Sequence, residues 1–161
     1  MWGDHMRKNR IARTAATALL GLGSVAAFAG TAQAEPIDYV RIELVELHCQ
    51  KNSEGDHDEA YLKITDANGN AVKVWPGNGV KYQTMGTGYV RSMADGNGNA
   101  ALILGKQQAR TLTLWDDDST SGDDKLGATL VTGSEAGAET QWRSVEGSGG
   151  VYVIGYRVID I

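Results

Sequence analysis

The densest group of possible metal ligands in this sequence lies in residues 114–127, which read LWDDDSTSGDDKLG. Five carboxylates fall between Asp116 and Asp124. Carboxylates this close repel one another, and a hard cation with many oxygen ligands relieves the repulsion; Ca²⁺ takes about 6–8 oxygens. The stretch therefore indicates either a calcium-binding loop or a solvated acidic loop that only adds solubility.

The segments around the acidic stretch predict an all-β domain. Apolar and polar residues alternate along much of the chain, and no segment after residue 34 shows a convincing helical apolar repeat. Strands are expected at 40–49, 59–65, 71–75, 101–104, 109–115, 126–131, 141–145 and 151–161, with weaker candidates at 80–84 and 89–93. Short strands separated by frequent turns predict an antiparallel β-sandwich of about eight strands.

Two turns share the motif Asp-x-Asn-Gly-Asn, at 66–70 and 95–99. The motif resembles the start of an EF-hand loop, but the glycine and glutamate that such a loop needs further on are absent. Because Asn-Gly supplies the positive φ angles of tight hairpins, both segments are predicted to be hairpin turns.

The acidic stretch also has a recognisable spacing. The pattern Asp-x-Asp-x₅-Asp-x-x-Gly, formed by Asp116, Asp118, Asp124 and Gly127, follows an apolar strand. It resembles the third calcium loop of the C2 domain, the membrane-targeting sandwich found in protein kinase C and synaptotagmin. Residues 58–63, DEAYLK, resemble the end of that family's first calcium loop.

The resemblance implies a Ca²⁺ site and a set of ligands. Glu59 would be the first-loop ligand, Asp116, Asp118 and Asp124 would come from the third loop, and Ser121 falls where a third-loop serine can add an oxygen. Glu54 and Asp56 are the two options for the earlier first-loop carboxylate. Glu at 59 and Ala60 depart from the family's Asp-Pro, and fewer ligands imply weaker binding. The loop tips, 51–55 and 119–122, are polar, which argues against membrane insertion.

The first 34 residues have the three parts of a secretory signal peptide. A basic segment at 7–13 precedes a small and apolar run at 14–29, and 32–34 read Ala-Gln-Ala, a cleavage pattern. The predicted organisation is a signal peptide at 1–34 and one sandwich domain at 35–161, secreted and extracellular. The second part has 11 Lys and Arg against 19 Asp and Glu, a formal charge of −8. This charge argues against a nucleic acid partner.

The sequence leaves two classes of function open. The favoured one is a secreted, non-enzymatic binding module or protein adaptor, with a calcium-stabilised loop cluster that holds another secreted protein, such as a lectin or toxin complex, or a cell-surface glycan. The alternative is a calcium-dependent extracellular hydrolase acting on wall or sugar polymers. No Gly-x-Ser-x-Gly elbow and no phosphate loop occurs.

Three tryptophans and the new amino terminus are the other candidate contact residues. Two of Trp75, Trp115 and Trp142 exposed on one face could stack a sugar ring. The extended segment 35–39 precedes the first strand, and its Ile37 and Tyr39 are predicted to engage a protein partner by adding to a sheet edge or lying in a groove. The alternative is that Tyr39 only begins the first strand. Cys49, the one cysteine, is expected to be a buried, inert thiol.

Overall fold

Ten strands and one short 3₁₀ turn make up the part of the chain that the structure, a computed structural model, describes. That part is residues 37–161 without 67, 95–101, 119–121 and 148–149. The predicted signal peptide at 1–34, residues 35 and 36 of the predicted arm, and the second turn at 95–99 lie outside the described residues. Within them, no helix is long and apolar enough to cross a bilayer.

Apolar and polar side chains alternate along the longer strands, so that one face of each strand is buried. In the first half of β1 (Tyr39–Lys51), every second residue is buried. The other strands are β2 (Asp58–Thr65), β3 (Ala71–Trp75), β4 (Gln83–Met85), β5 (Val90–Ser92), β6 (Leu102–Gly105), β7 (Ala109–Asp116), β8 (Asp124–Thr132), β9 (Gly137–Glu146) and β10 (Val151–Asp160), and the 3₁₀ turn is Gly133–Glu135. The structure has two more strands than the predicted eight because the weaker candidates at 80–84 and 89–93 each contribute a strand of three residues, β4 and β5.

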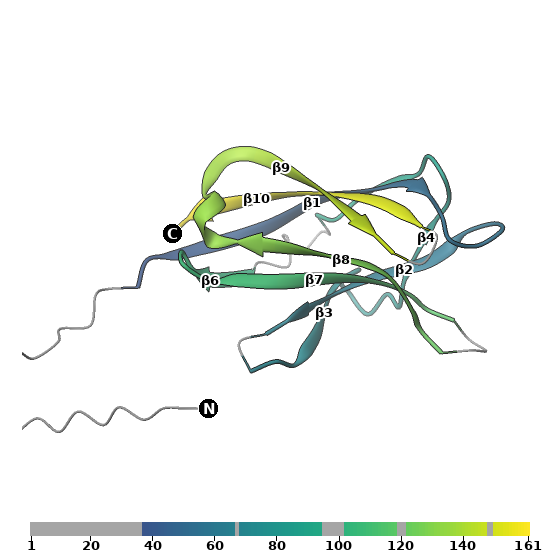
Figure 1. Ribbon diagram of the computed structural model, residues 1–161, viewed down its shortest axis with the longest axis horizontal. Helices are drawn as coiled ribbons and strands as arrows, with labels where there is room; N and C mark the ends of the chain where they lie inside the picture. The colour runs from purple at the N-terminus through teal and green to yellow at the C-terminus, as the bar shows by residue number, and fades with distance from the viewer. Residues whose placement is uncertain (1–36, 67, 95–101, 119–121, 148–149) are drawn as a thin grey trace, which may run out of the picture. The chain divides into compact units, whose positions relative to one another are not determined.

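The strands form two antiparallel layers. One layer has the order β3-β2-β7-β8, with β4 also paired to β2; the other has the order β9-β10-β1, with β5 and β6 both paired to β1. Figure 1 shows the layers lying over one another. A single pair between β8 and β9, Ala128 with Glu146, joins them. The predicted antiparallel β-sandwich is therefore confirmed.

The core lies between the two layers and is built from the inward residues of the longest strands. The largest fully buried apolar side chains include Leu47, Leu62, Leu114 and Tyr152. Cys49 is buried as expected, and burial is the main cause that raises the pKa of its thiol. Trp75 is buried, Trp115 is half-buried and Trp142 is 45% exposed. Only one of the three tryptophans is thus well exposed.

The hairpin between β2 and β3 confirms the predicted turn at 66–70. The Asp66 carboxylate accepts hydrogen bonds from the backbone N–H groups of Asn68 and Asn70, both at 2.8 Å, and these bonds lower its pKa. Gly69 has a φ of +85°, which glycine adopts without strain. The motif therefore serves as a turn, and its carboxylate is occupied by the turn's own amides.

Candidate metal-binding site

Strand register brings the acidic residues to one end of the sandwich. Ala60 at the start of β2 lies opposite Asp116 at the end of β7, and Asp116 in turn lies opposite Asp124 at the start of β8. The loop that leaves β1 after Lys51 reaches the same end, because it leads directly into β2. Carboxylates that are far apart in the sequence therefore gather where these strands start and finish.

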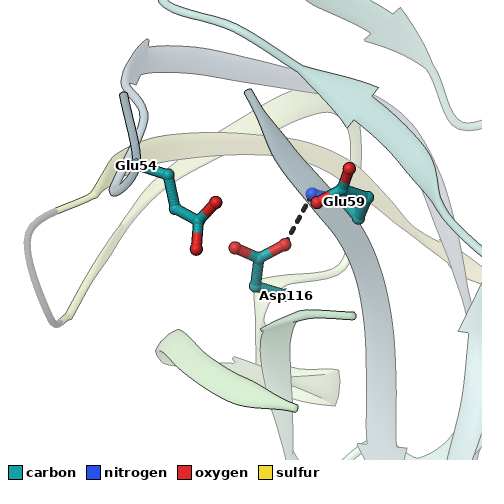
Figure 2. Close-up of side chains that lie close together, drawn as sticks. All are labelled: Glu54, Glu59 and Asp116. Atoms are coloured by element: carbon teal, nitrogen blue, oxygen red, sulfur yellow. Dashed lines mark hydrogen bonds between the residues drawn. The ribbon is translucent and has the colours of Figure 1, made fainter. Parts of the chain in front are cut away.

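Three of these carboxylates converge closely enough to share one cation. One ligand oxygen from each of Glu54, Glu59 and Asp116 lies within 4.8 Å of the others. Figure 2 shows the Glu54 carboxylate pointing from its loop toward Asp116, with Glu59 on the other side. Asp116 is 1% exposed, Glu59 is half-buried and Glu54 is exposed, so the triad is anchored inside and open to solvent on the Glu54 side.

Hydrogen bonds from backbone N–H groups fix Glu59 and Asp116 relative to each other. The Glu59 N–H donates to Asp116 Oδ1 at 2.5 Å, and the Asp117 N–H donates to the Glu59 carbonyl at 3.0 Å. The second Asp116 oxygen faces Glu54 (Figure 2). One oxygen of Asp116 thus orients the side chain, while the other faces the space between the carboxylates.

The negative charges in this cluster repel one another. Burial is the main cause that raises the pKa of Asp116 to about 7, the hydrogen bond from Glu59 works against this rise, and the charges of Asp58, Glu54 and Asp118 add to it. The pKa of Glu54 is also raised, with the charge of Asp118 as the largest cause. A divalent cation would favour the ionised form of each carboxylate and remove the repulsion.

The other predicted ligands lie around the triad. Asp118 is half-buried two residues after the end of β7, and Asp124 is exposed at the start of β8; both act on the pKa of Glu54 through their charge. Asp56 is exposed and is not part of the triad. Ser121 lies outside the described residues. The roles of these four residues as ligands stay predictions.

The remaining two carboxylates of the acidic stretch have partners of their own. Asp117 forms an ion pair with Lys81, with Nζ and Oδ2 2.7 Å apart, and Asp123 accepts a hydrogen bond of 2.5 Å from the Tyr61 hydroxyl. The cation of Lys63 lies 4.9 Å from the centre of the Tyr61 ring. Asp117 and Asp123 are the two carboxylates that the predicted ligand pattern leaves out, and in the structure each is paired with another side chain.

Asp58 is the residue of this region that sequence reasoning missed. It is fully buried beside Glu59, and its carboxylate accepts hydrogen bonds from Ser53, Glu54 and Tyr152. In the sequence it is one more acid in a loop rich in acids. The available signal was its place in the β2 pattern, where it precedes the buried Ala60 by two positions and so shares its face.

An apolar patch lies at the opposite end of β1. It consists of four residues with exposed fractions between 48% and 62%: Ile37, Tyr39, Ile103 and Ile161. Tyr39 pairs with Gly105 of β6, and its carbonyl accepts a hydrogen bond of 3.3 Å from the Ile161 N–H. Ile37 packs beside Gly105, with its Cγ2 atom 3.2 Å from where a β-carbon would lie. We call these four residues the strand-end patch.

Comparisons with known proteins identify the fold. No protein-family model and no curated protein matches the sequence. A structure of two C2 domains of Extended-Synaptotagmin 2 aligns with 89% of this chain at 13% identity and a TM-score of 0.53. Human GIVD cytosolic phospholipase A2 aligns with 80% of the chain at 14% identity and a TM-score of 0.50. A C2 domain of plant Extended Synaptotagmin 1 aligns with 79% of it at 10% identity and a TM-score of 0.49.

The similarity confirms the predicted resemblance at the level of the fold. The domain is a C2-like β-sandwich that carries an acidic cluster able to hold a metal ion. The chain covers 48% of the Extended-Synaptotagmin 2 structure and 17% of the phospholipase. At identities of 13% and 14% the comparison establishes the fold alone, so the function has to be argued from the residues of this chain.

Proposed function

We propose that this protein is a secreted, non-enzymatic binding module that holds Ca²⁺ at the acidic end of its sandwich. The observation that supports the proposal most directly is the approach of Glu54, Glu59 and Asp116, whose ligand oxygens lie within 4.8 Å of one another. Asp118 and Asp124 supply further oxygens beside them. An all-oxygen, carboxylate-rich site suits a hard cation and not a thiolate-seeking or imidazole-seeking metal.

The bound ion would stabilise the loops and would not act as an intracellular switch. Extracellular modules commonly bind Ca²⁺ at about 10⁻⁴–10⁻³ M, and a site with few ligands, one of them exposed, fits that range. At millimolar calcium the site would be occupied most of the time. Its effect is then to neutralise the repulsion between the loop that carries Glu54 and the one that carries Asp118.

Titration calorimetry on metal-free protein tests the calcium site. We expect heat on adding millimolar Ca²⁺, and a rise in melting temperature, for the wild type and for Glu139→Gln. Both responses should be lost in Glu59→Gln. Glu139 is the matched control because it is an exposed acid of β9, outside the triad and outside the predicted ligands. A wild type that gives no heat and no rise in melting temperature would contradict the proposal.

The partner we propose is another secreted protein, for example a member of a lectin or toxin complex. The strand-end patch supports this, because exposed apolar residues that lie together on a sheet face are typical of protein contacts. It includes Ile37 and Tyr39, the residues predicted from the sequence. A glycan platform has less support, since Trp142 alone among the three tryptophans is well exposed.

Capture from culture supernatant tests the partner. Tagged wild type, with and without chelator, is compared with Tyr39→Ser and Ile103→Ser, which make the patch polar. Leu130→Ser is the matched control, because Leu130 is 53% exposed on β8 in the other layer. We expect a protein retained by wild type and Leu130→Ser but released by the two patch variants. Equal recovery with all four proteins would show that the patch binds no partner.

A further inference from the structure

Hydrogen-bond donors enclose both oxygens of the Asp58 carboxylate. The Ser53 N–H lies 3.0 Å from both of its oxygens, and Oδ1 also accepts from the Ser53 hydroxyl at 3.0 Å and from the Glu54 N–H at 3.2 Å. Oδ2 accepts from the Tyr152 hydroxyl. The residue has no exposed surface. These donors use the acceptor capacity of the carboxylate, which is about four hydrogen bonds.

This geometry separates Asp58 from the candidate ligands. A carboxylate that is enclosed by N–H and O–H donors presents no free lone pair to a cation, and Asp58 is not part of the triad of Glu54, Glu59 and Asp116. Its partners are instead the Tyr152 hydroxyl and two residues of the loop, Ser53 and Glu54, whose backbone N–H groups it holds. Asp58 therefore acts on the site through the position of the loop after β1.

The hydrogen bond from Tyr152 extends this support to the other layer of the sandwich. Tyr152 belongs to β10, is fully buried, and lies opposite Cys49 of β1. Gly150 lies close to both Tyr152 and the loop: a β-carbon there would lie 3.1 Å from the Tyr152 ring and 3.6 Å from the Ser53 nitrogen. The loop is thus held against the core from two directions, by β2 and by β10.

We infer that Asp58 is a positioning residue of the metal site, which fixes Ser53 and Glu54 so that the Glu54 carboxylate stands beside Asp116. This inference rests on the proposed function. Without the Asp58 carboxylate, the loop would keep only the exposed hydrogen bonds that Asn52 makes with Thr87 and with the Glu54 carbonyl, and binding a cation would cost more of the entropy of ordering the loop. Partners that orient metal ligands typically contribute about 10–100-fold to metal affinity.

The decisive variant is Asp58→Asn, which keeps the volume but turns an amide NH₂ toward groups that are themselves donors. Tb³⁺ serves as the probe, with Ca²⁺ calorimetry beside it. We expect Asp58→Asn to bind Tb³⁺ about 10–100-fold more weakly than wild type. Luminescence lifetimes in H₂O and D₂O should show more water molecules on the bound ion, because Glu54 no longer reaches it. Glu139→Gln is the control for the change in charge, because Glu139 is an exposed acid of β9 outside the predicted ligands.

A double-mutant cycle with Glu54→Gln separates positioning from a general loss of stability. If Asp58 acts through Glu54, then Asp58→Asn lowers affinity in the wild-type background and has little further effect once Glu54 is replaced. Amide exchange supplies the structural readout: Ser53 and Glu54 should lose protection while the β7 amides keep theirs. If Asp58→Asn does not fold, Ser53→Ala, which removes only the hydroxyl donor, takes its place in the same comparisons.

The outcomes distinguish this inference from the proposed function. A wild type that binds neither Tb³⁺ nor Ca²⁺ removes the proposed function and the inference with it. A wild type that binds, combined with equal affinity and hydration for Asp58→Asn, overturns the inference and leaves the metal site intact. Additive losses in the double variant would also overturn it, because Asp58 would then act independently of Glu54.

Discussion

Replacing Asp116 by asparagine should change how the stability of the metal-free protein depends on pH. Burial raises the pKa of Asp116 from 3.8 to about 7 in the folded protein. Between these values the folded state keeps a proton that the unfolded chain has released, so the contribution of Asp116 to the free energy of unfolding is largest below about pH 4 and is lost as the pH rises toward 7. A shift of about three units corresponds to at most about 4 kcal/mol, or about 1.4 kcal/mol per pH unit.

Urea unfolding between pH 5 and pH 7, in metal-free buffer, measures this slope. Wild type and Asp56→Asn should both lose about 2–3 kcal/mol over this interval. Asp116→Asn should have a much flatter profile and should exceed wild type at pH 7, because an amide takes on no buried charge. Its oxygen can still accept the hydrogen bond from the Glu59 N–H.

Calcium should reverse the trend in the wild type. Since the ligand must be deprotonated, binding near pH 6 would release about one proton, and affinity would rise up to tenfold per pH unit until about pH 7. Asp116→Asn should bind weakly at every pH. The reasoning is refuted if wild type and Asp116→Asn show parallel stability profiles between pH 5 and pH 7, because the slope would then come from other groups.

Three further predictions concern membranes and stability. The protein should not cosediment with anionic liposomes at physiological salt, with or without Ca²⁺, because its loop tips are polar and residues 35–161 carry a charge of −8; calcium-dependent pelleting of most of the protein would contradict this. Gly133→Ala should lower the free energy of unfolding by about 1–3 kcal/mol, since a β-carbon would lie 2.7 Å from the Gly105 carbonyl oxygen. Gly55→Ala should change this free energy little, because no atom lies within 4 Å of a β-carbon there. Equal urea midpoints for the two variants would count against the packing argument. Glu135→Gln should lower the free energy of unfolding by about 1–3 kcal/mol, because the Glu135 carboxylate accepts hydrogen bonds from three groups. Glu139→Gln, at an exposed site, serves as the control in the same unfolding assay.

The strands were predictable because the signals that set them are local. Alternation placed nearly all of β1, β2, β7 and β10, and Asn-Gly chemistry placed the turn at 66–70. The ends were less accurate: β9 begins four residues before the expected 141. Gly137 and its neighbours have little apolar alternation, and their place in the strand comes from pairing with β10, where Gly137 lies opposite Val158.

The sequence could not predict which acidic residues face the candidate metal site and which form other hydrogen bonds or ion pairs. Glu54 and Asp56 look equivalent as loop carboxylates, and so do Asp58 and Glu59 as the end of that loop. What distinguishes Asp58 is a hydroxyl from Tyr152, 94 positions further along the chain. Lys81, which forms an ion pair with Asp117, also lies far from its partner in the sequence. Contacts of this kind depend on how the two layers pack, so neither composition nor spacing reveals them.

The antiparallel pairing of β1 with β10 determines how the domain would respond to being pulled. Val40 lies opposite Asp160, so the first and last strands begin and end at the same edge. Force applied between residues 37 and 161 would load the ladder one rung at a time from that edge, since its hydrogen bonds run perpendicular to the strands. The rungs near Cys49 and Tyr152, beside the acidic loops, would be loaded last. A module tethered through both ends would therefore lengthen by peeling at low force, and a cation at the far end would leave the force of the first opening unchanged.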